Sequence, residues 1–187
     1  LTGYNSGTIT FSDKDNAVSN RSVAGIVVGR HYVGDLVGYN DTDGTIDINY
    51  TLIGDRVAAT GDCVGGLVGL NASTEMLEKK LTIKPSSVQG RYYVGGAIGA
   101  NVVNPEENVT VSGLKVDNSL GTVTAEAFCG GLIGYQRTYT EKDRESGTLY
   151  ALLPGIAANN SNVPGTVTAS TNTHTITITA DGNSAGR

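Results

Sequence analysis

The chain has 187 residues and a formal net charge of −5, with 39% hydrophobic residues, 26 glycines and no tryptophan. This length is compatible with one domain, and the hydrophobic content suffices for a core of small and branched side chains. An acidic chain without a basic stripe is not expected to bind nucleic acid. No apolar run approaches the ~18 residues that span a bilayer, so we expect no direct membrane insertion.

A glycine-rich motif recurs through residues 1–136. Its clearest copy, residues 63–71, reads Cys-Val-Gly-Gly-Leu-Val-Gly-Leu-Asn, and related copies span 31–40, 93–101 and 128–136, while the chain opens with half a copy. The last glycine of each copy is separated from the next by steps of 35, 31, 30 and 35 residues, at Gly3, Gly38, Gly69, Gly99 and Gly134. Steps of this size are typical of repeat proteins.

Short β-branched, alternating runs lie between the motif copies and predict strands. In chain order they are residues 7–10, 23–29, 44–50, 81–84, 108–111 and 121–124. A turn is expected at 12–21 and a corner near Arg30 and His31. Strands followed by a glycine-rich run in units of roughly 30 residues favour an all-β fold, a parallel β-helix (β-solenoid) of about five to six coils. A right-handed crossover is the favoured one for parallel strands.

The repeat glycines are expected to be structural. They are predicted to take backbone angles closed to other residues and to let a neighbouring coil approach closely. The set comprises Gly3, Gly34, Gly38, Gly65, Gly69, Gly95, Gly99, Gly130 and Gly134. The apolar pairs at 36–37, 67–68, 97–98 and 132–133 are predicted to form interior columns about 4.8 Å apart.

A side-chain amide stands two residues after the last glycine of every copy. The five residues are Asn5, Asn40, Asn71, Asn101 and Gln136. Amides at one corner of successive coils are expected to bond to one another as a ladder. The alternative that they present a row of amides to a ligand stays open. Tyr4, Tyr39 and Tyr135 follow the same glycine in three copies and are expected to pack at that corner rather than bind sugar.

The rest of the chain is less regular. Residues 72–80 favour a short helix or loop, 101–107 a second excursion, and 137–146 a solvated loop, while 149–154 is apolar enough to cover an open end. Alternating residues in 163–180 predict strands that finish the solenoid as an irregular coil or pair with the edge of another molecule. We therefore expect a single β-solenoid domain over 1–187, with repeat coils in 1–136 and irregular strands in 137–187.

The sequence predicts no catalytic residue, metal site or cofactor. Asp35, Asp47 and Asp62 are the best carboxylates for a polysaccharide-acting β-helix enzyme, but nothing in the sequence brings them together. The run 41–44, Asp-Thr-Asp-Gly, lacks the further oxygen ligands of a calcium loop and favours an ordinary turn. Cys63 and Cys129 lie in coils two apart, too distant for a disulfide, and are expected to be buried free thiols.

The run Gly-Gly-Leu-Val-Gly-x-Asn and the opening residues 1–9 resemble the GLUG repeat of large bacterial surface proteins, including adhesin-like proteins and the non-catalytic part of immunoglobulin-A-cleaving metallopeptidases. The chain departs from that pattern at Asp35, Ala97 and Gln136, and it has no His-Glu-x-x-His run. The resemblance implies an extracellular module at the bacterial cell surface. Its role would be adhesive or that of a spacer, with a host or cell-surface protein or glycan as partner. The alternatives are a self-assembling subunit of an extracellular filament, which associates through its ends, and the polysaccharide-acting enzyme.

Overall fold

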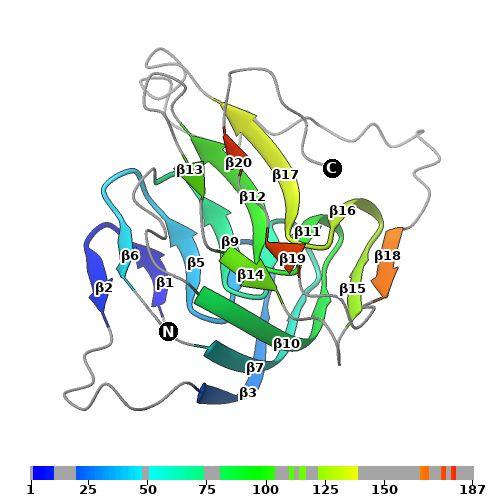
Figure 1. Ribbon diagram of the computed structural model, residues 1–187. Coiled ribbons are helices and arrows are strands. Elements are labelled where there is room, and N and C mark those ends of the chain that lie inside the picture. Colours follow the sequence, from blue (N-terminus) through cyan, green and yellow to red (C-terminus); the bar gives the residue numbers. More distant parts are fainter. Residues whose placement is uncertain are drawn as a thin grey trace.

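The computed structural model describes residues 2–10, 20–47, 51–73, 81–103, 110–111, 114–116, 122–138, 165–168, 174–175 and 178–179 (Figure 1). In these segments all regular structure is strand and none is helix, which confirms the all-β class for the part described. The expected helix or loop at 72–80 lies outside the described residues from 74 onward. Of the excursion expected at 101–107, residues 101–103 are strand, and 104–107 lie outside the described residues. Of the loop expected at 137–146, residues 137–138 are strand and the rest lies outside, as does 149–154. The turn expected at 12–21 is strand at 20–21, and 12–19 lie outside. Pairing with neighbouring strands extends these strands beyond the bounds that local composition indicated.

Three sheets contain most of the strands. The amide sheet has the parallel order β1 (Thr2–Asn5), β5 (Val37–Asn40), β9 (Val68–Asn71), β12 (Ile98–Val103) and β17 (Ile133–Thr138). The middle sheet, also parallel, has the order β4 (Val33–Gly34), β8 (Val64–Gly65), β11 (Tyr92–Gly95) and β16 (Ala127–Gly130). The long-strand sheet begins with the parallel strands β3 (Asn20–Gly29), β7 (Thr51–Ala59) and β10 (Leu81–Gln89), and β14 (Leu114–Val116) and β15 (Thr122–Ala125) then pair in parallel with β10.

Each repeat visits the three sheets in one order. The chain passes from the long-strand sheet to the middle sheet and then to the amide sheet in β3-β4-β5, β7-β8-β9, β10-β11-β12 and β15-β16-β17 (Figure 1). Equivalent residues of successive motif copies stand side by side, as Val33, Val64 and Val94 do in the middle sheet. This arrangement of parallel sheets is compatible with a parallel β-solenoid.

The remaining strands are short. β2 (Thr8–Thr10) pairs in parallel with β6 (Thr45–Asp47). The C-terminal strands β18 (Gly165–Thr168), β19 (His174–Thr175) and β20 (Ile178–Thr179) pair antiparallel with β15, β14 and β13 (Thr110–Val111). They therefore add to edges of the same chain, with the opposite direction to the strands of the repeats.

The middle sheet packs on both faces. Its residues Val33, Val64 and Val94 form one buried cluster with Val57 and Val88 of the long-strand sheet. The residues just before these valines face the other way. Cys63 and Tyr93 form a second buried cluster with the amide-sheet residues Leu70 and Ala100.

The turn into each middle-sheet strand has an unexpected backbone conformation. Tyr32, Cys63, Tyr93 and Phe128 occupy equivalent positions and have φ of 53°, 60°, 55° and 55°. This left-handed region is uncommon for residues other than glycine and costs of order 1 kcal/mol or more. Tyr32, Cys63 and Tyr93 pack in or against one buried cluster and the valines that follow them in the other, so packing in the two clusters offsets the strain.

Two roles are expected of the repeat glycines, unusual backbone angles and close backbone approach, and the structure supports only the second. Among the described residues, the only glycine in the left-handed region is Gly25, with φ of 142°, at the bulge in β3. The expectation that the repeat glycines take angles closed to other residues is therefore wrong. The expectation of close approach is confirmed, since a Cβ added to Gly69 or Gly99 would lie 2.5 or 2.4 Å from the middle-sheet nitrogen of Val33 or Val64.

Close approach of the backbone also explains most of the other repeat glycines. An added Cβ at Gly34, Gly65 or Gly95 would lie 2.2, 2.0 or 2.0 Å from a carbonyl oxygen of the amide-sheet strand that follows. Gly38, Gly130 and Gly134 are equally confined, whereas Gly3 has nothing within 4 Å. At these glycine positions the middle and amide sheets thus meet backbone to backbone, which leaves no room for a side chain there. The apolar residues predicted to form interior columns are nearly all buried: Leu36, Leu67, Ala97 and Leu132 in one column, and Val37, Val68 and Ile98 in the other. Ile133 is half-buried.

This packing predicts the effect of one added methyl group. We expect Gly99→Ala to lower the free energy of unfolding by about 3 kcal/mol, because the new Cβ overlaps the backbone of Val64. Gly7→Ala is the matched control, since its Cβ meets nothing within 4 Å, and it should change stability by no more than about 0.5 kcal/mol. Urea denaturation followed by circular dichroism measures both. Equal stability of the two variants would contradict the backbone-to-backbone contact.

Candidate functional site

The five predicted amide residues lie in register across the amide sheet. Each side-chain NH2 donates to the side-chain oxygen of the next repeat: Asn5 to Asn40 at 2.8 Å, Asn40 to Asn71 at 2.8 Å, Asn71 to Asn101 at 2.7 Å, and Asn101 to Gln136 at 2.7 Å. One line of hydrogen bonds therefore connects five repeats.

The amides also bind the backbone of their own repeat. Asn40 Nδ2 donates to the Gly44 carbonyl at 3.1 Å, and Asn71 Nδ2 donates to the Ser73 carbonyl at 2.9 Å. Because a carbonyl only accepts, these bonds fix which end of each amide is nitrogen. Asn40, Asn71 and Asn101 are 0% exposed. These three amides are therefore not accessible to a ligand.

The ladder predicts that a substitution in its middle lowers the free energy of unfolding more than one at its end. Asn71→Leu should lower the free energy of unfolding by about 3 kcal/mol, because it leaves the buried amides of Asn40 and Asn101 without their partner. Asn5→Leu removes a single rung at the end of the line and should cost about 1 kcal/mol. Urea denaturation of both variants measures the difference. A loss at Asn5 as large as that at Asn71 would contradict a shared ladder.

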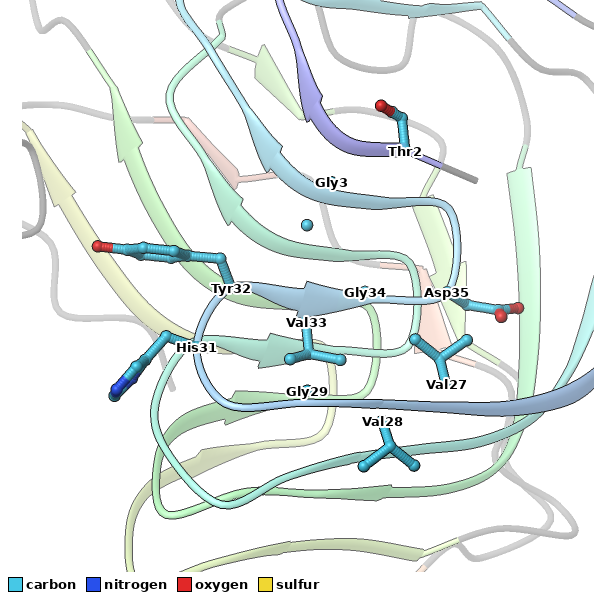
Figure 2. A pocket seen from close by; sticks show the side chains of 11 residues that line it. Thr2, Gly3, Val27, Val28, Gly29, His31, Tyr32, Val33, Gly34 and Asp35 are labelled. Atoms are coloured by element: carbon cyan, nitrogen blue, oxygen red, sulfur yellow. The ribbon is translucent and has the colours of Figure 1, made fainter.

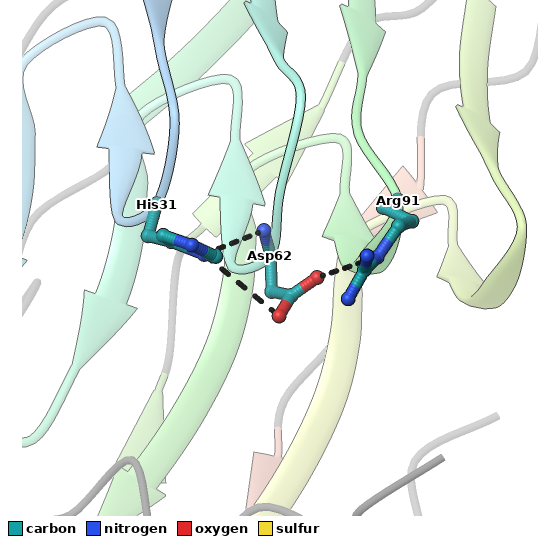
Figure 3. A network of polar contacts seen from close by, with 3 residues as sticks. All are labelled: His31, Asp62 and Arg91. Atoms are coloured by element: carbon teal, nitrogen blue, oxygen red, sulfur yellow. Dashed lines mark hydrogen bonds and ion pairs between the residues drawn. The ribbon is translucent and has the colours of Figure 1, made fainter. Parts of the chain in front are cut away.

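Asp62, considered above as a catalytic carboxylate, lies in a contact that crosses repeats (Figure 3). Its Oδ1 is 3.4 Å from Arg91 Nε, and its Oδ2 is 3.8 Å from His31 Nδ1. The Asp62 backbone N–H donates to the same His31 nitrogen at 3.2 Å. The Asp62 side chain is 4% exposed and lies between the Arg91 guanidinium and the His31 imidazole, which come from two other repeats. This geometry favours a role in holding three repeats together.

The other two candidate carboxylates lie elsewhere. Asp35 is buried in the turn between β4 and β5, and Asp47 is half-buried at the end of β6. Asp62 lies in the turn between β7 and β8, so the structure places the three on different segments. Among the described residues, no group of three or more His, Cys, Asp or Glu side chains is arranged to hold a metal ion.

The segment 41–44 forms a turn in which the Gly44 N–H donates to the Asp41 carbonyl at 2.9 Å. The Asp41 carboxylate accepts hydrogen bonds from the hydroxyls of Tyr4 and, at 3.2 Å, Tyr39. The rings of these tyrosines meet edge to face, with centroids 5.5 Å apart, and Tyr39 also lies 6.0 Å from Tyr32. Tyrosines of two repeats thus share one carboxylate.

This environment raises the pKa of all three hydroxyls. The hydrogen bond to Asp41 is the main cause for Tyr4. Burial is the main cause for Tyr39, followed by the Asp41 charge. Burial also raises the pKa of Tyr32 to about 12. Tyr135 packs against the second buried cluster in the same way as Tyr39, as expected for the corner tyrosines.

The raised pKa of Tyr32 predicts alkaline destabilisation. The neutral hydroxyl is favoured in the folded chain, so its contribution to stability is complete below the unfolded pKa of about 10. That contribution is lost as the pH rises to about 12. Tyr32→Phe should reduce the alkaline loss by about 1 kcal/mol, after allowance for solvent screening of a half-exposed ring. Urea titrations across this pH range test it, and an identical alkaline loss in both proteins would contradict it.

Both cysteines are free thiols, as the sequence predicted. Cys63 is 0% exposed, and burial followed by the Asp62 charge raises its pKa. Cys129 is half-buried and not fully buried as expected, because it lies in β16, the last strand of the middle sheet, and it packs against the first cluster on the opposite face of that sheet. Its thiol donates to the Val123 carbonyl at 3.6 Å. The buried thiol of Cys63 is thus held in its unreactive protonated form.

A pocket of about 270 Å³ lies at the end of the stack near the N-terminus (Figure 2). Val27 and Val33 project into it between β3 and β4, and Asp35 lies at its rim, while Tyr32 points away. Thr2 and Gly3 of β1 form its opposite wall. The pocket is therefore an apolar step between strand edges.

The sequence did not identify three features: the contact of His31 and Arg91 with Asp62, the left-handed turn residues, and the pocket. Counting back from the last glycine of each motif copy would have placed His31 and Asp62 at equivalent positions. This equivalence of position was the one signal in the sequence for the contact between His31 and Asp62. No glycine or asparagine marks the left-handed turns, so these carried no sequence signal.

Comparison with known protein families, curated proteins and solved structures finds no match to this chain. No helix long and apolar enough to cross a membrane occurs in the segments that the structure describes.

Proposed function

We propose that this chain is a non-catalytic module of a bacterial extracellular surface protein, with an adhesive or spacer role. The module is a right-handed parallel β-helix of about five to six coils in a single domain. Five amide-sheet strands in one register support the helix. The motif-level resemblance to GLUG repeats supports the compartment. The partner is a host or cell-surface protein or glycan.

The observation that carries the proposal is the use of polar side chains between repeats. The buried amides bond to one another, Asp62 contacts two other repeats, and Asp41 joins Tyr4 to Tyr39. Groups that an enzyme would direct at a substrate are here directed at the next repeat. A stack held together in this way is suited to act as a rigid rod.

The outward face of the long-strand sheet is a surface suited to binding. Its exposed residues include Arg56, Gln89 and Thr122, and Arg56 Nη2 donates to Gln89 Oε1 at 3.3 Å. Parallel pairing places Arg56 beside Ser87, and Ser87 beside Thr122. A polar face of regular spacing offers hydrogen bonds to a protein or glycan, and arginine is among the residues enriched where an interface gains most of its affinity.

The test is a binding screen on arrays of cell-surface glycans and proteins, paired with an assay for polysaccharide cleavage. We expect saturable binding without cleavage, and binding about ten-fold weaker for Arg56→Ala. Gly7→Ala is the control for an unrelated surface position and should bind as the parent protein does. Cleavage activity that is lost in Asp35→Asn or Asp47→Asn would overturn the proposal in favour of the enzyme.

A self-assembling filament subunit is the second candidate. Among the described strands, the amide and middle sheets end at β17 and β16, and Phe128 of β16 is 40% exposed. Such edges are able to pair with another chain. Sedimentation over increasing protein concentration tests this candidate, which predicts growing polymers. A protein that stays monomeric at high concentration removes it.

A further inference from the structure

The His31 imidazole packs on a glycine of the next repeat. The residues that stand eight positions before the last glycine of each complete motif copy are Arg30, Gly61, Arg91 and Glu126. Three of them are charged and exposed, whereas Gly61 is buried. A Cβ added to Gly61 would lie 2.5 Å from both Cε1 and Nδ1 of the His31 ring. The imidazole therefore fills the space that a side chain at position 61 would need.

The hydrogen bond between these two repeats fixes the protonation of the imidazole. The Asp62 backbone N–H donates to His31 Nδ1 at 3.2 Å. Because a backbone N–H only donates, Nδ1 must present its lone pair, and the proton of the neutral ring is then on Nε2. The Tyr32 N–H donates in turn to the Asp62 carbonyl at 3.1 Å. Asp62 is thus bonded to the preceding repeat through both its N–H and its carbonyl.

A second partner for the same imidazole nitrogen lies close by. Asp62 Oδ2 is 3.8 Å from His31 Nδ1, and Oδ1 is 3.4 Å from Arg91 Nε (Figure 3). Arg91 is itself fixed, because its N–H donates to the Gly61 carbonyl at 2.8 Å and its guanidinium lies 4.4 Å above the Tyr92 ring. The carboxylate is therefore held with Oδ1 toward Arg91 and Oδ2 toward His31.

The charged groups around His31 favour a response to its protonation. Asp62 comes from the turn between β7 and β8, and Arg91 from the turn between β10 and β11. Arg30 and Tyr32 flank His31 in its own turn, and burial raises the pKa of Tyr32 to about 12, so its hydroxyl stays neutral in acid. Of these groups Asp62 is the anion. A protonated imidazole beside it gains a charge-assisted hydrogen bond.

We propose that the contact of His31 with Asp62 is a proton-operated switch at the corner of the stack. The neutral imidazole accepts the Asp62 backbone N–H at Nδ1. When Nδ1 takes up a proton it no longer accepts, and it donates to Asp62 Oδ2 instead. Protonation thus exchanges a backbone hydrogen bond between two repeats for an ion pair. Histidine is the side chain that ordinarily changes charge between about pH 5 and 8, so mild acid operates the switch.

The switch acts on a turn that is already strained. Cys63, directly after Asp62, has a φ of 60°. Once the Asp62 N–H has lost its acceptor, the bonds from the Tyr32 N–H to the Asp62 carbonyl and from the Val33 N–H to the Cys63 carbonyl still hold this turn to the preceding repeat. A turn with fewer bonds opens locally at a lower free energy. Acid therefore loosens this corner, whereas the amide ladder contains no titratable group. The proposal does not rest on the extracellular role proposed above.

Nuclear magnetic resonance of the full chain, from about pH 8 to about pH 5, tests the switch. At the higher pH we expect the His31 ring to carry its proton on Nε2, which the chemical shifts of the two ring nitrogens report. The Asp62 amide signal should move with the same midpoint as the ring signals. Exchange of its proton, corrected for the intrinsic effect of pH, should be about five-fold faster in acid. His174→Gln removes the other histidine of the chain and should leave these changes as they are in the parent protein.

His31→Asn is the variant that separates the switch from a general effect of acid. Its side-chain oxygen accepts the Asp62 N–H but takes up no proton, so the corrected exchange rate should be equal at both pH values. An acid effect of the same size in this variant would overturn the proposal. A neutral ring protonated on Nδ1, or an Asp62 amide that does not follow the His31 titration, would overturn it as well. These last two results come from the parent protein and depend on no variant.

Discussion

The contact on which this fold depends is the approach of two backbones at the repeat glycines, where no side chain stands between them. The middle and amide sheets come so close that a Cβ at every repeat glycine except Gly3 would lie 1.9 to 2.5 Å from the nearest backbone atom. Such a contact excludes water and fixes the relative position of the two sheets. Parallel pairing within the amide sheet then brings the asparagines that follow these glycines into register.

Close approach of the two sheets has a cost elsewhere in the repeat. The chain must enter the middle sheet so that one side chain faces the long-strand sheet and its predecessor faces the amide sheet. At this entry Tyr32, Cys63, Tyr93 and Phe128 have a left-handed backbone conformation. Large side chains at these strained positions are buried or half-buried against the amide sheet, except that Phe128, in the last middle-sheet strand, is 40% exposed. The residues whose backbone is strained are therefore largely the same residues whose side chains pack against the amide sheet.

Features with a period were the ones that the sequence predicted well. The positions of the strands at 8–10, 81–84 and 122–124, and the free cysteines, follow from alternation and from the spacing of the glycines. β7 was not predicted, since the expected strand at 44–50 ends before it, although Gly54 and Arg56 pair with both β3 and β10 in the sheet. Propensity is weaker than pairing on both sides in such a strand.

What the sequence did not predict depends on geometry between repeats. Antiparallel pairing of β18 with β15 required knowing which edge lies free at the end of the stack. The contact between Asp62 and Arg91 required the register of two turns whose lengths differ by one residue, and burial of Asp62 depends on both. For the repeat glycines, close approach was predicted correctly and unusual backbone angles were not. A glycine in a motif indicates either property without distinguishing them.

The line of amides has a direction. Every nitrogen points toward the repeat that follows, from Asn5 to Gln136, and the bonds to the Gly44 and Ser73 carbonyls fix that orientation. Aligned amide dipoles add, as peptide dipoles do along a helix. The buried row of amides therefore has a net dipole, with its negative end at Asn5 and its positive end at Gln136. The two ends of the stack are electrically distinct, although the repeats between them are built alike.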